Sequence, residues 1–367
     1  MSIAMKAPGR YVQGFGERKN LGRSIKKMGK HFYLIASAGG KKRYGDEIME
    51  NIKEQELEVS FGEFHGEATK DEVFSHMDHI KELGCDAVIG MGGGKVLDTA
   101  KACAENLGGL PLILIPTVAS NDAPCSGVAV LYNDQGVVVK AVMLRRNPDL
   151  VVVDTEILSK APARLFSAGI GDALATWYEA RACEKNHVKT MARGTITETV
   201  SMMCKLCNDL LVKYGREALE GVKKGEHTEA LEKVVEASIL LSGIGFESGG
   251  LAAAHAINDG FAQEPQTHGM YHGEKVAFGL LTQLVLENAP EEELNSVLAF
   301  LKDVDLPITL AQLGIKEVNE ANLHKVAEMA VVPTQSTKNL RADISADEVY
   351  EAILKADALG RAFLAGK

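Results

Sequence analysis

The sequence predicts an α/β nucleotide-binding domain followed by an all-helical domain. In the first part of the chain, short apolar runs alternate with amphipathic helical stretches, which is the order of elements in an α/β fold. Several runs, such as AVIG, LILI and LVVV, are almost continuously apolar, as is typical of parallel strands covered by helices on both faces. From Ala163 onwards no segment has the pattern of a strand, so the second part is expected to be helical.

Seven apolar runs are the predicted strands of the first domain. They are residues 31–37, 57–61, 86–90, 112–116, 127–132, 137–144 and 150–154. Between them, residues 70–83 are a predicted helix, because Val73, Met77 and Ile80 recur at a spacing that places them on one face.

Eight helical patterns follow in the second domain. They are residues 172–185, 189–214, 229–243, 251–261, 275–287, 294–304, 323–330 and 346–359. The boundary is expected near residues 158–162, where Ser159 is a helix-capping residue type and Pro162 suits the first turn of a helix. The predicted domains are therefore residues 1–160 and 161–367.

Charge and composition exclude several classes of protein. The chain has 367 residues with 40 Lys and Arg against 50 Asp and Glu, a net charge of −10, which disfavours binding to nucleic acid. Its six cysteines are too sparse for a disulfide framework, and Cys204 and Cys207, inside a helical pattern, are predicted to be small buried residues. The longest apolar stretch, residues 110–119, is shorter than the roughly 20 residues of a membrane span, and residues 1–16 lack a signal-peptide core. A cytoplasmic protein that binds no membrane is expected.

A glycine-rich loop joins the predicted strand 86–90 to a helix. Gly92, Gly93 and Gly94 allow close approach to the backbone, and the free N–H groups of the helix that starts near Lys95 suit a pyrophosphate. The loop matches neither the GxGxxG nor the GxxxxGK[ST] pattern, so a tight turn without a ligand is the alternative. Farther along, Asp98 and Lys101 are three residues apart, and a surface ion pair is their simpler interpretation.

Polar residues also follow the predicted strand 112–116. They are Thr117, Ser120, Asn121, Asp122 and Ser126, and they fall at the carboxyl edge of the sheet, where open α/β sheets bind ligands. An ordinary polar turn is the alternative.

Three histidines and one carboxylate form a possible metal site in the second domain. His268 and His272 are four residues apart and would share a helix face if that segment is helical. With Asp172, the second domain can offer two imidazoles and a carboxylate to a divalent cation. His255 lies among small apolar residues, where a lone histidine is more often a core residue than a ligand.

Four segments resemble a known family. GGGKVLDTAK (92–101), TVASNDAPCSG (117–127), SAGIGDALATWYEA (167–180) and HGEKVAFG (272–279) occur in the order and spacing of the iron-containing alcohol dehydrogenase superfamily. The resemblance is closest to its zinc-dependent glycerol dehydrogenase branch and covers essentially the whole chain. It implies a Rossmann-like N-terminal domain, an all-α C-terminal domain of the dehydroquinate synthase-like type, and a homo-oligomer.

The resemblance also implies roles for individual residues. Asp172, His255 and His272 would be the zinc ligands and part of the substrate site, with Fe²⁺ or another divalent metal as the alternative. Asp122 would hydrogen-bond the substrate hydroxyls, and His268 would contact the substrate or support a ligand. The implied cofactor-binding residues are Gly93, Gly94 and Lys95 at the pyrophosphate, Thr117 and Ser120 near the adenine, Ser126, Val128 and Tyr132 near the nicotinamide, and Ser37 and Asp98.

The implied reaction is the NAD-dependent oxidation of glycerol or another small 1,2-diol, with dihydroxyacetone as the product from glycerol. A divalent metal lowers the pKa of an oxygen that it binds, and two vicinal hydroxyls can chelate one metal, which favours a diol over a simple alcohol. The carbon-bound hydrogen then leaves as a hydride to the nicotinamide.

Two positions depart from the family pattern. Ser37 stands where many members have an Asp for the ribose 2′-OH, and it is followed by Lys41, Lys42 and Arg43, so NAD is the first choice but NADP use is also expected. Asn258 stands where iron-dependent relatives often carry a further histidine.

Three alternatives stay open at this point. Another polyol or alcohol dehydrogenase of the superfamily would have the same motifs. A glycerol-1-phosphate dehydrogenase should show cations near the metal, and only Lys275 of the HGEK segment offers one. A nucleotide-binding protein with a vestigial metal site is the non-enzyme alternative, although all three implied ligands are present.

Overall fold

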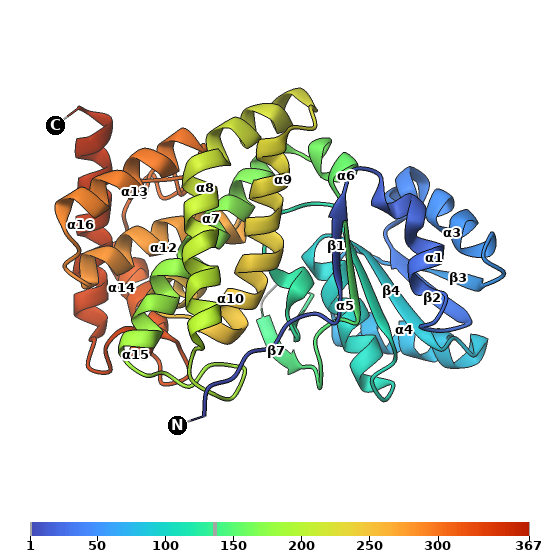
Figure 1. Cartoon of the computed structure of the whole chain (residues 1–367). Helices are drawn as coiled ribbons and strands as arrows, with labels where there is room; N and C mark the ends of the chain where they lie inside the picture. The colour runs from blue at the N-terminus through green and yellow to red at the C-terminus, as the bar shows by residue number, and fades with distance from the viewer. Residues whose placement is uncertain (1, 135–137, 367) are drawn as a thin grey trace. The chain divides into compact units, whose positions relative to one another are not determined.

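The computed structural model describes residues 2–134 and 138–366, which form two compact units (Figure 1). The sheet unit comprises Lys6–Pro162 and Gly221–Gly243, and the helical unit comprises Met1–Met5, Ala163–Glu220 and Ile244–Lys367. A parallel-sheet unit and a helical unit confirm the predicted fold class.

One helical segment belongs to the sheet unit, which a single boundary near residue 160 does not predict. In Gly221–Gly243, the backbone oxygen of Glu232 accepts a hydrogen bond from Gln13 at 2.9 Å, and its carboxylate accepts one from Thr155 at 2.6 Å. These contacts are long-range in sequence, so the helical periodicity of the segment contains no signal for them.

The sheet has six parallel strands in the order β1-β8-β5-β4-β2-β3. They are β1 (Tyr11–Gly14), β2 (His31–Ala36), β3 (Glu58–Glu63), β4 (Ala87–Gly92), β5 (Leu112–Pro116) and β8 (Leu150–Asp154). The edge strand β1 has no counterpart among the predicted strands, because its four residues are only partly buried and contain no apolar run.

Alternate side chains of the strands pack on two layers of helices. Phe32 and Leu34 of β2 belong to a core with helices α1 (Leu21–Ile25) and α3 (Asp46–Lys53). Tyr33 and Ile35 belong to a second core. Its helices are α4 (Lys70–Leu83) and α5 (Gly94–Asn106). Both faces of the sheet are therefore buried, as the continuous apolar runs predicted.

Two of the predicted strands lie outside this sheet. β6 (Val128–Tyr132) and β7 (Val138–Met143) form a separate antiparallel pair. The burial of β6 alternates and β7 is mostly exposed, which is the pattern of a one-sided hairpin and not of a central parallel strand. Val137, the first residue of the predicted run 137–144, lies outside the described residues.

After β8 the described chain contains no further strand, as predicted. Its helices are α6 (Thr155–Ser159), α7 (Ala163–Lys185), α8 (Glu198–Lys224), α9 (Glu229–Val235), the π-helix η4 (Glu236–Leu241), α10 (Ser242–Gly249), α11 (Ala253–Phe261), α12 (His272–Leu286), α13 (Glu291–Asp303), α14 (Glu320–Ala330), α15 (Thr337–Leu340) and α16 (Ala346–Leu364). The predicted helix 189–214 begins only at Glu198, because His187 and Arg193 have positive φ angles of 51° and 66°, which interrupt a helix.

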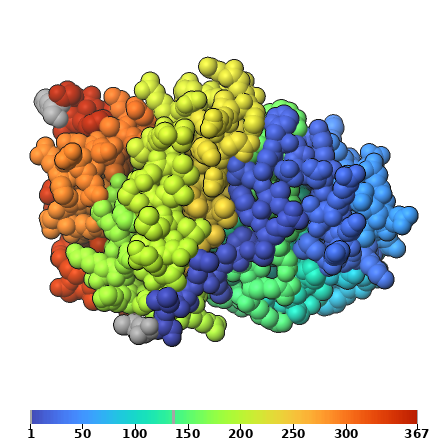
Figure 2. Space-filling view, viewed as in Figure 1, coloured from blue at the N-terminus to red at the C-terminus, as the bar shows by residue number. Residues whose placement is uncertain are grey.

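Helix α8 contributes a broad part of the face seen in Figure 2. Its side chains Met202 and Leu206, four residues apart, are 61% and 45% exposed.

Within residues 2–134 and 138–366, no single helix is long and apolar enough to cross a membrane. Only the bent pair Glu229–Gly249 and Ala253–Phe261 has that length and composition when taken together.

Candidate functional site

Three helices of the helical unit bring one carboxylate and two imidazoles together. Asp172 lies in α7, His255 in the first turn of α11, and His272 is the first residue of α12. Nε2 of His255 lies 3.3 Å from Oδ1 of Asp172, and Nε2 of His272 lies 3.2 Å from the same oxygen. Among the described residues, these form the one group of three or more metal-ligating side chains whose ligand atoms all lie within 4.8 Å of one another.

Glycines next to two of these residues let the helices α7 and α12 touch. A Cβ atom on Gly273 would collide with the backbone oxygen of Ala168, and one on Gly171 would lie 2.6 Å from the backbone oxygen of Gly273. Since Gly171 precedes Asp172 and Gly273 follows His272, the helix crossing itself sets the short distance between the two side chains.

A buried carboxylate, Glu179, holds His255 in place. Its Oε2 lies 2.6 Å from Nδ1 of His255, and its Oε1 accepts hydrogen bonds from the backbone N–H groups of Ala252 and His255 at the start of α11. Nδ1 of His255 therefore donates to Glu179, which leaves Nε2 directed at Asp172. Sequence reasoning missed Glu179, although it follows Asp172 by seven residues and thus lies on the same helix face.

A salt bridge anchors the first turn of α12, where His272 lies. The guanidinium of Arg164 makes two contacts with the carboxylate of Glu274, at 2.6 and 2.9 Å, and lies 4.8 Å from the ring centre of Tyr271. Glu274 also accepts a hydrogen bond from the backbone N–H of Tyr271 at 2.6 Å. This network, which the sequence analysis did not identify, connects the starts of α7 and α12.

The electrostatics of the cluster favour a cation. Burial alone would raise the pKa of Asp172, but the imidazoles of His272 and His255 hold that pKa well below its ordinary value. Burial works to lower the pKa of His255, whereas the carboxylates of Glu179 and Asp172 raise it well above its ordinary value. The two buried carboxylates, Asp172 and Glu179, are thus stabilised by positive charge in this cluster.

The donor set fits a divalent metal. One carboxylate with two imidazoles is a ligand combination found at zinc and iron sites that keep open positions. Zinc bonds of about 2.0–2.1 Å in a tetrahedral arrangement would separate neighbouring ligand atoms by about 3.3 Å. Both Asp172–histidine distances are close to this value.

His268 does not join the cluster. His268 and His272 would share a face only in a continuous helix, and the segment is not one: the short helix η5 (Pro265–Thr267) ends before His268 and α12 begins at His272. His268 is exposed in the intervening turn, and its contact with the substrate stays a prediction. Asn258 is buried in α11, and its amide donates to Asp259 at 3.1 Å.

In the sheet unit, the glycine loop lies at the carboxyl end of β4. Gly93 is the N-cap of α5, and Gly94 and Lys95 form its first turn, so the N–H groups of this turn are available to an anion. Nζ of Lys95 lies 2.5 Å from the carboxylate of Glu67 and 5.3 Å from the ring centre of Tyr132. The loop therefore has the geometry expected of a phosphate site.

The segment after β5 lies against this loop. The backbone N–H of Thr117 donates to the oxygen of Gly92 at 3.0 Å, and a Cβ atom on Gly94 would lie 2.8 Å from the amide nitrogen of Asn121. Ser37 follows the neighbouring strand β2, and its hydroxyl accepts a hydrogen bond from the N–H of Gly40 at 3.1 Å. Strands β2, β4 and β5 thus bring Ser37, the glycine loop and Thr117 to one edge of the sheet.

The predicted substrate residue Asp122 lies farther along the segment after β5. Its Oδ2 accepts a hydrogen bond from the hydroxyl of Ser242 at 2.8 Å, and the carboxylate is almost buried. Ser126 is fully buried, and Val128 begins β6. These residues lie in one continuous stretch of the sheet unit.

Asp98 and Lys101 are not a surface ion pair. Asp98 is 6% exposed and Lys101 is 0% exposed, and Nζ of Lys101 lies 3.6 Å from Oδ1 of Asp98. Burial raises the pKa of Asp98 to about 6, against the opposing effect of Lys101. The pair belongs to the interior of the sheet unit.

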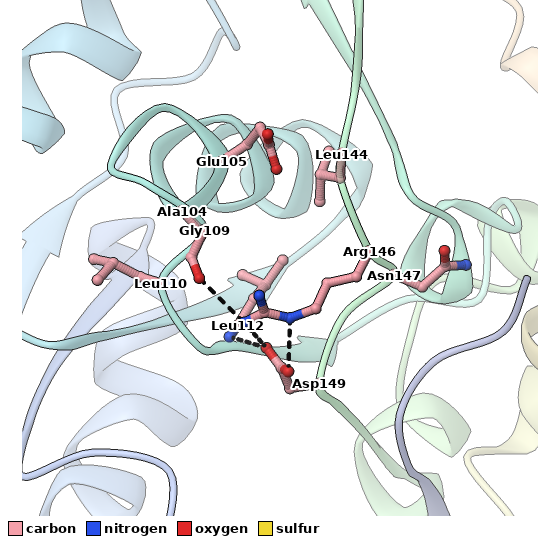
Figure 3. A pocket seen from close by; sticks show the side chains of 9 residues that line it. All are labelled: Ala104, Glu105, Gly109, Leu110, Leu112, Leu144, Arg146, Asn147 and Asp149. Atoms are coloured by element: carbon pink, nitrogen blue, oxygen red, sulfur yellow. Dashed lines mark hydrogen bonds and ion pairs between the residues drawn. The ribbon is translucent and has the colours of Figure 1, made fainter.

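Two hollows lie away from the predicted site residues. One of about 10 Å³, room for about one water molecule, lies between α5, β5 and the segment before β8, where Arg146 and Asp149 form an ion pair (Figure 3). The other, of about 450 Å³, is lined mostly by charged and polar residues of α16 and the end of α12. Neither has the chemistry of a dinucleotide or diol site.

Comparison with known proteins gives consistent matches. Residues 8–155 match the family model described as iron-containing alcohol dehydrogenase. A glycerol dehydrogenase from Escherichia coli O6:H1 is 44% identical over 364 residues, 99% of each chain. A glycolaldehyde reductase from Halobacterium salinarum is 38% identical over 361 residues, 98% of this chain and 99% of that protein.

Solved structures agree with these sequence matches. The crystal structure of glycerol dehydrogenase from Schizosaccharomyces pombe has a TM-score of 0.95 and 34% identity, and covers 100% of this chain and 93% of that chain. That of a probable glycerol dehydrogenase from Sinorhizobium meliloti has a TM-score of 0.92 and 38% identity, and covers 98% and 100%.

Proposed function

Because the chain belongs to the iron-containing alcohol dehydrogenase family, we propose that it oxidises glycerol and related 1,2-diols with a nicotinamide dinucleotide and a divalent metal. The observation that carries this proposal is the group of Asp172, His255 and His272, which offers three ligand atoms to one cation. The chain matches glycerol dehydrogenases over almost its whole length.

The helical unit supplies the metal ligands, with zinc as the first choice and Fe²⁺ or another divalent cation as the alternative. A divalent cation held there would supply the positive charge that makes a diol hydroxyl easier to ionise. Glu179 keeps His255 oriented with Nε2 towards the cluster, and Arg164 keeps the first turn of α12 in place through Glu274. Asp172 contributes the negative charge that retains the cation.

The sheet unit supplies the dinucleotide site. A nicotinamide dinucleotide would supply the hydride acceptor. The N–H groups of Gly94 and Lys95 at the start of α5 would hold its pyrophosphate, with the ammonium of Lys95 moving from Glu67 to the phosphates. Asp122, with Oδ2 held by Ser242, would accept a hydrogen bond from a diol hydroxyl.

NAD is the proposed cofactor, with measurable use of NADP. The hydroxyl of Ser37 accepts from Gly40 and can still donate to a ribose oxygen, and it brings no negative charge against a 2′-phosphate. Lys41 is already paired with Asp46 at 2.7 Å, so a 2′-phosphate would depend on Lys42 and Arg43.

The change Ser37→Asp tests this choice. Since the new carboxylate would repel a 2′-phosphate and accept a hydrogen bond from a 2′-hydroxyl, kcat/KM with NADP should fall by at least about tenfold while that with NAD is kept. Ser37→Asn is the uncharged control and should retain NADP use. A large preference for NAD in the unchanged protein, with NADP activity insensitive to Ser37→Asp, would refute the prediction.

A second substrate class has support in one relative. The 38% identical Halobacterium salinarum protein is a glycolaldehyde reductase, and reduction of glycolaldehyde gives ethylene glycol, itself a 1,2-diol. An anionic substrate such as glycerol-1-phosphate has less support, because Arg164 is already paired with Glu274. Lys275, which follows Glu274 in the sequence, is a further cation, and burial lowers the pKa of its ammonium group.

A substrate panel after metal removal tests the proposed function. Activity on glycerol, 1,2-propanediol, ethylene glycol, ethanol and glycerol-1-phosphate is measured with NAD, then after treatment with a chelator, and again after addition of zinc. We expect diols to be preferred over ethanol, and the activity to be lost with the metal and restored with zinc. Faster oxidation of ethanol than of the diols would contradict the diol proposal, and NAD binding without any chelator-sensitive activity would favour a non-enzymatic nucleotide-binding protein.

A further inference from the structure

A fully buried lysine in α5 has no place in the function proposed so far. Lys101 lies two turns after the glycine loop, and its side chain is 0% exposed. Taking an ammonium group out of water is costly unless its donors find partners, and an apolar side chain of similar size would fill the same space more cheaply. A lysine is therefore expected at this position only if its N–H donors have a role.

Three hydrogen-bond acceptors of Lys101 lie in one short stretch of chain. Its Nζ donates to the backbone oxygen of Ala123 at 2.6 Å, to that of Val128 at 2.7 Å, and to the hydroxyl of Ser126 at 3.3 Å. An ammonium group has three N–H donors and no acceptor. Its donors thus join both ends and the middle of the segment 123–128, while Asp98 lies 3.6 Å away as the nearby negative charge.

This stretch has little regular structure of its own. Only the short helix η3 (Ala123–Cys125) precedes β6, and side chains donate to several of its backbone oxygens. Asn147 donates to the oxygen of Cys125 at 3.0 Å, and Ser242 donates to the carboxylate of Asp122 at 2.8 Å. Buried donors from three different parts of the sheet unit therefore hold the segment, and Lys101 reaches three of its residues.

We propose that Lys101 is a positioning residue that holds the segment 122–128 in the shape needed for the diol and for the nicotinamide half of the cofactor. The inference rests on the proposed function, because it uses the predicted contacts of Asp122 and Val128 with these ligands. The adenosine and pyrophosphate half of the cofactor binds before this segment, at Gly93–Lys95 and Thr117, and does not depend on Lys101.

The change Lys101→Met separates the two halves of the cofactor. Methionine keeps the length of the side chain but removes every donor. Titration with NADH and with ADP-ribose, which lacks the nicotinamide, should show the Kd for NADH raised by at least about tenfold and the Kd for ADP-ribose changed by less than about twofold. The KM for glycerol should rise as well, because Asp122 is joined directly to Ala123, whose backbone oxygen would lose its bond to Lys101.

Two further variants make the test decisive. Lys81→Met removes an exposed lysine of α4 in the same unit and should change neither Kd. Lys101→Gln keeps an N–H donor, should show the same split with a smaller change, and serves if the methionine variant does not fold. Equal losses for NADH and ADP-ribose, or no loss for either in a folded variant, would overturn the inference. Failure of the unchanged protein to bind NADH would instead overturn the proposed function.

Discussion

The side chain of Glu179 decides how His255 faces Asp172. Its two oxygens accept three hydrogen bonds, two from backbone N–H groups of α11 and one from the imidazole. A carboxylate behind a ligating histidine fixes the tautomer and the direction of the ring, and makes the other nitrogen a better ligand. At the scale of single residues, the proposed metal site therefore depends on a group outside the three ligand candidates.

The change Glu179→Gln tests this dependence. The amide is isosteric but uncharged, so the affinity for zinc should fall by about 10–100-fold, measured by competition with a chromogenic chelator. Glu184→Gln, on the same helix and bonded to Ser201, is the matched control and should leave zinc affinity unchanged. Equal zinc affinity in the Glu179→Gln variant and the unchanged protein would show that this carboxylate does not support the ligand.

At the scale of elements, the contact between α7 and α12 brings Asp172 and His272 together. Helices approach this closely only where a side chain is missing, and Gly171 and Gly273 provide that space from the two sides. The residues of the crossing and the residues of the cluster are immediate neighbours in the chain. A change in the packing of α7 against α12 is therefore expected to change the distance between Asp172 and His272 as well.

The change Gly273→Ala should separate the two helices. The added methyl group would collide with the backbone oxygen of Ala168, which cannot rotate away, so we expect a loss of stability of about 1–3 kcal/mol and a lower zinc content of the folded protein. Denaturant unfolding and metal analysis measure the two effects. Gly269→Ala is the control, because its Cβ would meet no atom within 4 Å; similar losses in both variants would argue against the crossing as the cause.

At the scale of the whole molecule, a cluster of charges joins the segments that follow β1 and β8, the first and last strands of the sheet along the chain. The guanidinium of Arg18 lies 2.7 Å from Asp154 and 2.9 Å from Glu156, and Lys160 lies 2.9 Å from the other oxygen of Glu156. The Lys160 ammonium and the Arg18 guanidinium hold the pKa of Glu156 down to about 2, from an ordinary value of 4.5. The ionised form of Glu156 is thus favoured by folding.

This shift predicts a pH dependence of stability. Because the pKa is lower in the folded state, the stabilisation is fully present above about pH 4.5 and is lost as the pH falls towards 2. Glu156→Gln should therefore lower the free energy of unfolding at pH 7, and its difference from the unchanged protein should shrink between about pH 5 and pH 2 in urea titrations. The exposed Glu54→Gln serves as the control, and a difference independent of pH would contradict the assignment.

Much of the architecture could be predicted from local patterns, and the failures have physical causes. β5 and β8 agree with the predicted runs because continuous apolar residues identify a strand buried on both faces. β1 was missed because an edge strand of four partly buried residues has no such pattern. His268 and His272 do not share a helix face, because four-residue spacing has this meaning only inside a continuous helix and their segment is not one. The predicted homo-oligomer and cytoplasmic location stay predictions.

The sequence by itself determined the two kinds of unit, the glycine loop and the identities of the possible metal ligands, because periodicity and motifs depend on residues close together in the chain. Only the tertiary structure decided that Asp172, His255 and His272 meet, that Glu179 supports one of them, and that Lys101 is buried under the segment of Asp122. Glu179 and His255 are 76 residues apart. Their contact follows from where α7 and α11 pack, which depends on the shapes and volumes of many side chains at once and is not encoded in any local pattern.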